Sequence, residues 1–269
     1  MAETVAWVPR EEVRHDVVTA GPLERLAATL DYAAVPWRNG EVPPLGHWLF
    51  MLPDARQTML GPDGHPVRGD FIPPIAQPRR MWAGSRLSFP GMLRVGDAVT
   101  RRSTVGPVVD KGDMTFVTLR HEVSANGEVA VVEEQDLVYL PERTSGESAT
   151  AKPVDMPEAE TVRSIVADEA MLFRYSALTF NAHRIHYDLP YATGVEHYPG
   201  LVVHGPLLAT LLVDHVRRAT PDGRITSFEF RARSPVICGD SFDLCQSGED
   251  LWVRKANDTV AMTAKITWA

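Results

Sequence analysis

The sequence predicts an α+β fold in which a unit of one apolar helix against an antiparallel sheet occurs twice. A polar segment rich in Ser, Thr and Pro over residues 141–157 has no apolar period and is typical of a linker. On each side of it, helical signals come first and strand-like runs follow. The segments FPGMLRVGD (89–97) and SPVICGD (234–240) share a strand, turn, Gly-Asp, strand pattern. An internal duplication explains these observations most economically.

The first half begins with a short predicted helix, because Gly21-Pro22 precedes the Leu- and Ala-rich run LERLAATL. Residues 37–78 are rich in Pro and Gly and predict a long ordered loop around a short helix near 45–52. Long loops in compact domains are often functional. From Arg86 the pattern changes to strands, with a hairpin turn at Asn126-Gly127.

In the second half, residues 164–180 lead into an irregular segment and then into the most apolar helix of the chain. This helix begins at Gly205-Pro206 and continues as PLLATLLVDHVRR, with an apolar face wide enough to be wrapped by a sheet. Four strands are expected after it, in the runs ITSFEFRARS, SFDLCQSG, LWVRKAN and VAMTAKITWA.

Composition limits the classes of function. The 269 residues carry a formal charge of −8, which disfavours a nucleic-acid partner. The first 16 residues are too charged for a signal peptide, and the apolar stretch 201–216 is interrupted by His, Pro and Asp, so no membrane span is expected. The two cysteines, Cys238 and Cys245, are too few for a disulfide scaffold. We therefore expect reduced thiols and a cytoplasmic location.

The densest group of polar residues lies between Phe173 and Gly205, just before the apolar helix. Four of the nine histidines are here, at 183, 186, 197 and 204. Three explanations are open. The set His183, His186, Asp188 and His204 could bind a metal, although its spacing is loose. The histidines could cap and brace a loop. One of them could also act as a general base beside a group that polarises a carbonyl.

The run NAHRIHYDLPYA, followed by GLVVHGPLL, resembles the motif of the MaoC-like, or (R)-specific enoyl-CoA hydratase, family. The family pattern is Asp-x-Asn-Pro-x-His-x-Asp…Ala, then a stretch that ends in His-Gly. On this pattern His186 matches the catalytic histidine and Gly205 the glycine of His-Gly. Asp188 and Ala192 also match. Asn181 falls on the usual catalytic aspartate and His183 on the asparagine, so the pattern is not fully kept.

FRYSALTFNxHRIHYD is closer still to a branch with mitochondrial-type 3-hydroxyacyl-thioester dehydratases and mesaconyl-C4-CoA and itaconyl-CoA hydratases. PPLGHWLFM (43–51) and PRRMWAGS (78–85) resemble its non-catalytic half. The resemblance implies a double hot-dog fold, with two antiparallel sheets each wrapped around a central apolar helix. It implies a non-catalytic N-terminal hot dog over residues 1–145 and a catalytic one over 156–269. The implied enzyme is a hydro-lyase without cofactor or metal.

The resemblance also implies a mechanism. Neutral His186 would take a proton from water, and the backbone N–H of Gly205, at the amino end of a helix, would stabilise the thioester oxyanion. Because an amide cannot accept a proton, Asn181 would only orient the water or substrate. His186 would then shuttle the proton almost alone.

The substrate pocket is expected where the two halves meet, under the Pro-rich loop. An acyl-CoA thioester partner requires cationic and aromatic groups there, and a dicarboxylic acyl group requires an arginine for bidentate pairing. The candidates are Arg79, Arg80, Trp82, Arg174, Arg184, His183, Tyr198 and His204.

Several functions remain open on the sequence alone. The favoured one is hydration of a mesaconyl-C4-CoA or itaconyl-CoA type of substrate. The alternatives are a (3R)-hydroxyacyl-ACP/CoA dehydratase of fatty-acid metabolism, which would need an apolar tunnel, and a non-catalytic acyl-thioester-binding module. A thioesterase would need a carboxylate that Asn181 does not supply. We also expect a homo-oligomer, a dimer of double hot dogs, because sheet edges and faces remain available.

Overall fold

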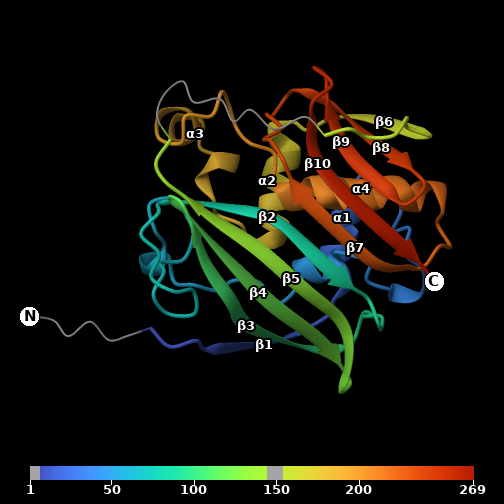
Figure 1. The fold of residues 1–269 in the computed structure, drawn as a ribbon. Helices are drawn as coiled ribbons and strands as arrows, with labels where there is room; N and C mark the ends of the chain where they lie inside the picture. Colours follow the sequence, from blue (N-terminus) through green and yellow to red (C-terminus); the bar gives the residue numbers. More distant parts are fainter. Residues whose placement is uncertain (1–6, 144–153) are drawn as a thin grey trace, which may run out of the picture.

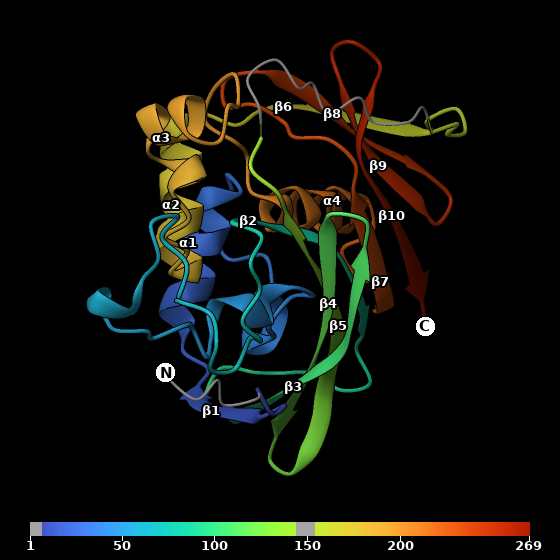
Figure 2. The same cartoon turned by 60° about the vertical axis from the view of Figure 1, so that its left-hand side comes forward.

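The computed structural model describes residues 7–143 and 154–269. Most of the predicted linker, residues 144–153, lies outside the described residues, so the proposed boundaries at 145 and 156 remain predictions. The described chain forms one large curved antiparallel sheet, with its helices gathered on the concave side (Figures 1 and 2).

The sheet has ten strands in the order β1-β3-β4-β5-β2-β7-β10-β9-β8-β6. The first five of that order come from the first half and the last five from the second, as the predicted duplication requires. Their bounds are β1 Glu11–Val17, β2 Arg79–Ser88, β3 Ala98–Lys111, β4 Met114–Ala125, β5 Glu128–Leu140, β6 Thr161–Val166, β7 Ile225–Ala232, β8 Ser241–Ser247, β9 Asp250–Lys255 and β10 Val260–Trp268.

The two half-sheets are hydrogen-bonded to each other rather than separate. Strand β2 pairs with β7 in antiparallel register, from Gly84 opposite Arg231 to Ser88 opposite Ser227. A Cβ at Gly84 would lie 2.3 Å from the carbonyl oxygen of Phe230, so only glycine permits this close approach. The expected pair of sheets is therefore one continuous surface.

Helix α4, Gly205–Ala219, is the central helix of the second half, and every residue from Leu207 to Val216 is buried. Figure 2 shows it lying inside the curve of the sheet. The other helices are α1 Ala20–Thr29, α2 Glu169–Thr179 and α3 Leu189–Gly194, and the 3-10 turns are η1 Arg38–Gly40, η2 Gly46–Leu49, η3 Gln57–Met59 and η4 Arg184–His186.

The first half differs from its prediction in its central helix. The segment expected to be helical near residues 45–52 forms only the single turn η2, although Leu45, Leu49, Phe50 and Met51 are buried in the common core. Leu45 and Met51 adopt positive φ angles of 69° and 51°, which interrupt a helix on both sides of the turn.

Each half also begins with a strand where the sequence analysis expected helical signals first. Strands β1 and β6 form the two outer edges of the sheet, and most of their side chains are exposed. An edge strand with two solvated faces has no clear apolar alternation, which explains why the pattern did not reveal them.

Two other expectations concern chemistry and location. Cys238 and Cys245 are both free thiols, as predicted. Within residues 7–143 and 154–269, no helix is long and apolar enough to cross a membrane.

Candidate active site

A cavity of about 1740 Å³ is lined by residues of both halves of the chain. Its walls come from the Pro-rich loop and β2 of the first half, and from α2, the following loop and the start of α4 of the second. The predicted pocket therefore lies where the sequence analysis placed it, under the loop of the first half.

His186 ends the turn η4 and faces this cavity, with 7% of its surface exposed. Its Nδ1 lies 2.7 Å from the carbonyl oxygen of Val202, which can only accept, so Nδ1 carries the proton. The neutral ring thus keeps a lone pair on Nε2. Burial lowers the pKa of His186 to about 4, and the ring is therefore neutral at pH 7.

His204 lies behind His186 rather than in the cavity wall. The two rings stack with centroids 3.6 Å apart and an interplanar angle of 20°. His204 is fully buried, its Nε2 lies 2.8 Å from Ser176 Oγ, and burial lowers its pKa well below the usual value. It was predicted to bind substrate, but the structure gives it the position of a support for the His186 ring.

Gly205 is the first residue of α4, so its amide N–H has no partner within the helix. It lines the cavity on the same wall as His186. A Cβ at this position would meet only the carbonyl oxygen of Trp82, at 3.9 Å. No described protein atom therefore requires glycine here, and Gly205 lines the cavity at the amino end of α4.

Asn181 and His183 form a tight turn just after α2. The side-chain oxygen of Asn181 accepts from the backbone N–H of His183 at 3.0 Å, and both residues line the cavity. The amide nitrogen of Asn181 has no hydrogen-bond partner in the described part of the chain, so it can donate to a bound molecule. His183 Nε2 is buried and has no hydrogen-bond partner among the described residues, and burial lowers the pKa of this ring.

The arginine candidates separate into three groups. Arg79 lines the cavity but is paired with Glu196 at 2.8 Å. Arg80 lines the cavity and forms no ion pair with any described residue. Arg174 is exposed on α2, and Arg184 pairs with Asp188 at 2.7 Å, and neither lines the cavity.

The positions of Arg174 and Arg184 correct the prediction that they bind substrate. Arg184 instead braces the loop: it pairs with Asp188, and its Nη1 donates to the carbonyl oxygen of Pro62 at 2.9 Å. Asp188 in turn caps α3 by accepting from the backbone N–H of Tyr191. The contact with Pro62 joins residues far apart in the chain, which a sequence motif cannot specify.

Trp82 and Tyr198 both lie in the cavity wall. The indole Nε1 of Trp82 donates to Ser85 Oγ at 2.9 Å, and its ring packs edge-on against Trp48. The Tyr198 ring lies beneath the guanidinium of Arg79, which is 6.0 Å from its centroid. Both predicted substrate-contact residues are thus in position to meet a bound molecule.

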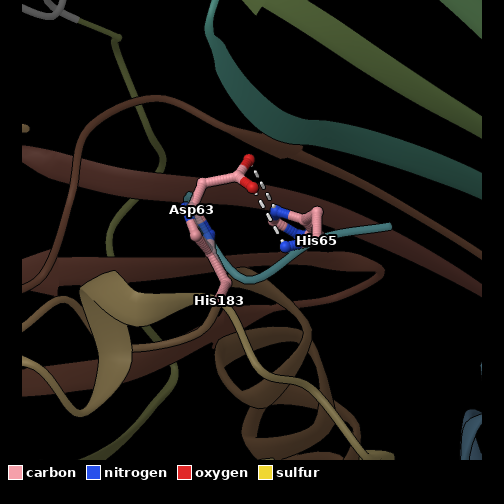
Figure 3. A group of neighbouring side chains, drawn as sticks. All are labelled: Asp63, His65 and His183. Carbon is pink, nitrogen blue, oxygen red and sulfur yellow. Dashed lines mark hydrogen bonds and ion pairs between the residues drawn. The ribbon is translucent and has the colours of Figure 1, made fainter. Parts of the chain in front are cut away.

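Asp63 and His65 belong to the site, although the sequence analysis did not single them out. They lie in the Pro-rich loop and approach His183, with the His65 and His183 ring centroids 4.3 Å apart (Figure 3). The only signal for them was that a long loop is often functional.

Asp63, His65 and His183 are also the one group among the described residues whose donor atoms are close enough to hold a metal ion, all within 4.8 Å. The set predicted from spacing, with His186, Asp188 and His204, does not form such a group. Asp63 and His65 are already hydrogen-bonded to each other, and Arg80 places a positive charge beside both histidines. The group therefore has an explanation without a metal ion.

The inner end of the cavity, inside the first half, is polar. Glu133 is buried and holds His47 Nε2 at 3.2 Å, Trp48 Nε1 at 3.0 Å and Ser85 Oγ at 2.7 Å. Burial raises the pKa of Glu133, but these donors outweigh it and lower the pKa to about 2. The neighbouring Gln135 accepts from His121 at 3.1 Å. Along β5, alternate residues face the same side of the sheet, so Glu133 and Gln135 lie on the buried face with Val131 and Leu137. This alternation could have identified the two polar residues as buried from the sequence.

Comparisons with known proteins agree over most of the chain. Residues 45–238 match the family model described as hydroxyacyl-thioester dehydratase type 2. Mesaconyl-C(4)-CoA hydratase of Chloroflexus aurantiacus is 41% identical over 93% of this chain and 94% of its own length. The mitochondrial hydroxyacyl-thioester dehydratase type 2 of Schizosaccharomyces pombe is 26% identical over 90% and 92%.

Two solved structures show the same fold at low identity. HtdX of Mycobacterium tuberculosis covers 97% of this chain and all of its own, with a TM-score of 0.72 and 18% identity. The MaoC-like dehydratase of Phytophthora capsici has the same TM-score, 13% identity and coverage of 98% and 96%. The predicted double hot-dog fold is therefore confirmed.

Proposed function

Because this chain belongs to the hydroxyacyl-thioester dehydratase type 2 family and is therefore a hydro-lyase, we propose that it reversibly hydrates a short-chain enoyl-CoA of the mesaconyl-C4-CoA or itaconyl-CoA type. The product would be a 3-hydroxyacyl-CoA. The observation that carries this proposal is that the lone pair of buried, neutral His186 and the free N–H of Gly205 face one cavity.

In the proposed hydration, the thioester carbonyl accepts a hydrogen bond from the Gly205 amide. The dipole of α4 is also favourable at its amino end. The hydrogen bond and the dipole interaction both become stronger as the carbonyl oxygen becomes negative. Polarising the carbonyl makes the β-carbon electrophilic. Gly205 thus stabilises the enolate that forms as water adds.

His186 is the proposed base. Its Nε2 lone pair takes a proton from the water as the oxygen attacks the β-carbon. Val202 fixes the tautomer, and the stack on His204 fixes the plane of the ring. Asn181 supports this step with its free amide nitrogen, which donates to the water oxygen and leaves the proton pointing to His186.

The charge around the cavity favours a short acyl chain with a second carboxylate. Of the four predicted arginines, Arg80 alone both lines the cavity and has no ion-pair partner among the described residues, so it is available for a substrate carboxylate. The inner end holds His47, His121, Glu133 and Gln135, and burying an apolar tail against these groups would be unfavourable.

The alternative functions receive less support. A (3R)-hydroxyacyl dehydratase of fatty-acid metabolism would place a long apolar tail against these polar groups. A non-catalytic thioester-binding module would have no use for a neutral buried His186 held in one tautomer. We also propose a cytoplasmic location and a homo-oligomer.

The test is a panel of CoA thioesters in which loss of the enoyl absorbance is followed. The panel holds crotonyl, mesaconyl-C1, mesaconyl-C4, itaconyl and a long-chain enoyl thioester. We expect the highest kcat/KM with a dicarboxylic member. A preference for the long-chain thioester would favour the dehydratase alternative, and turnover of none would contradict the proposed function.

A further inference from the structure

The hydration proposed above uses only one group that exchanges protons, His186, yet hydration needs two proton events on different atoms. Water loses a proton to a base, and the α-carbon gains one. On the catalytic half, Asn181 cannot exchange protons, and Asp188 is committed to Arg184 and the cap of α3. His204 lies behind His186, outside the cavity wall.

The first half supplies a histidine and a carboxylate at this place. In the tight loop 61–66, Asp63 Oδ1 accepts from the backbone N–H of His65 at 3.0 Å, and Oδ2 lies 3.2 Å from His65 Nδ1 (Figure 3). Burial opposes the ionised form of Asp63, but the His65 contacts outweigh it and lower the pKa. An ionised carboxylate only accepts, so His65 carries its proton on Nδ1 and keeps a lone pair on Nε2.

This loop is fixed against the loop of His186 by three contacts. The backbone N–H of Arg184 donates to the Asp63 carbonyl at 2.9 Å, and its side chain donates to Pro62. Gly64 packs so tightly that a Cβ there would lie 1.9 Å from the carbonyl oxygen of Ala182. The position of His65 relative to His186 is therefore set by the fold.

The result is a row of imidazoles along the cavity. The centroids of His65 and His183 are 4.3 Å apart, and those of His183 and His186 are 5.5 Å apart. His65 and His186 both line the cavity, with His183 between them. The charged and titratable groups that face His65 are Asp63 and Arg68 from its own loop, Arg80 from β2 and His183.

We propose that His65, held by Asp63, is the second proton-transfer residue of the site and exchanges the proton at the α-carbon of the thioester. This inference rests on the proposed function. It assigns to the N-terminal half the second proton transfer, which the amide of Asn181 cannot perform.

In the dehydration direction, His65 Nε2 takes the α-proton, and the C–H electron pair passes into the enolate held by Gly205. That proton passes from His65 through His183 or cavity water to the neutral His186. The enolate collapses, the β-carbon to oxygen bond breaks, and the leaving hydroxyl takes the proton from the imidazolium of His186 so formed. Both rings are then neutral again, and hydration is the reverse.

The test compares His65→Gln and Asp63→Asn with wild type and with a control, His15→Gln. His15 is exposed on β1 and outside the cavity wall. We expect His65→Gln to lower kcat on the order of 10²–10⁴-fold, the usual worth of one proton-transfer group, while KM changes little. In D₂O the wild type should label one face of the α-carbon, whereas the residual product of His65→Gln should carry deuterium on both faces.

A second readout does not depend on activity. Nitrogen-15 NMR of the wild type should show His65 with its proton on Nδ1. Asp63→Asn should move that proton to Nε2, because an amide nitrogen donates to Nδ1, and should lower kcat at least tenfold with the fold retained by circular dichroism.

The proposal is overturned if His65→Gln keeps wild-type kcat and labels a single face, or if the wild-type His65 proton lies on Nε2. Stoichiometric zinc bound by the wild type and lost in His65→Gln would also overturn it, in favour of a metal ligand. A wild type that turns over no thioester contradicts the proposed function instead, and the NMR readout then still decides the orientation of His65.

Discussion

Gly64 offers the sharpest test of the contact between the two halves. Its φ angle is +90°, and a Cβ there would lie 1.9 Å from the Ala182 carbonyl oxygen, about 1.5 Å short of an ordinary contact distance of 3.4 Å. In Gly64→Ala the loop that carries Asp63 and His65 must therefore move away from the loop of His186. Displacement of catalytic groups by about 1 Å can cost roughly 10²-fold in rate, and we expect a loss of that order in kcat/KM.

Gly69 provides the matched control in the same loop. Its φ angle is +109°, but a Cβ there would have no neighbour within 4 Å. Both alanine variants should lose about 1–3 kcal/mol of unfolding free energy from backbone strain. Only Gly64→Ala should lose activity. The assay is kcat/KM on the preferred thioester, together with urea unfolding of each variant.

The reasoning is refuted if Gly64→Ala and Gly69→Ala have the same kcat/KM. Equal losses would mean that backbone strain alone, rather than contact between the loops, governs activity.

Three further predictions concern other parts of the site. Because the pKa of folded His186 is about 4, below that of an unfolded histidine, the unfolded state binds the proton first as pH falls. Between about pH 6.5 and 4, urea unfolding should therefore show the wild type losing up to about 3 kcal/mol more stability than His186→Gln. Arg80→Met should lower kcat/KM for the dicarboxylic thioester about 10–100-fold and leave crotonyl-CoA unchanged, while Arg174→Met changes neither; equal effects on both thioesters would count against a carboxylate contact. Gly205→Ala should fold at least as stably as wild type, since the Cβ has room, yet lose at least about tenfold in kcat by crowding the oxyanion; unchanged kinetics would remove Gly205 from the mechanism.

The second half of the chain was the more predictable part. Asn181, His183, His186 and Gly205 lie within one short stretch that runs from the end of α2 to the start of α4. A contiguous segment of this kind is shaped mainly by local rules, such as the turn at Asn181 and the unpaired amide at the start of a helix. The structure accordingly brings these residues to one cavity.

Long-range contacts were not predictable from patterns. Asp63 and His65 reach the site only because the Pro-rich loop crosses to the other half, and no periodicity encodes that path. Arg184 looked like a ligand for a carboxylate, but its partner is Asp188 of its own loop. Arg79 and Arg80 are adjacent in sequence, yet among residues 7–143 and 154–269 only Arg79 forms an ion pair, with Glu196.

The pairing of the two half-sheets is another long-range contact that the sequence patterns did not predict. The predicted strands were correct in kind, but the pairing of β2 with β7 depends on Gly84 meeting the backbone of Phe230. A single glycine inside a strand indicates a close approach without naming its partner.

The central claim is that His186 is the base that hydrates an enoyl thioester, and His186→Ala tests it most directly. With the preferred dicarboxylic thioester, we predict a fall in kcat on the order of 10²–10⁴-fold, with the fold retained by circular dichroism and with His15→Ala unchanged. A folded His186→Ala variant that keeps kcat within about threefold of the wild type would contradict the assignment, because a proton-transfer group is worth far more than that.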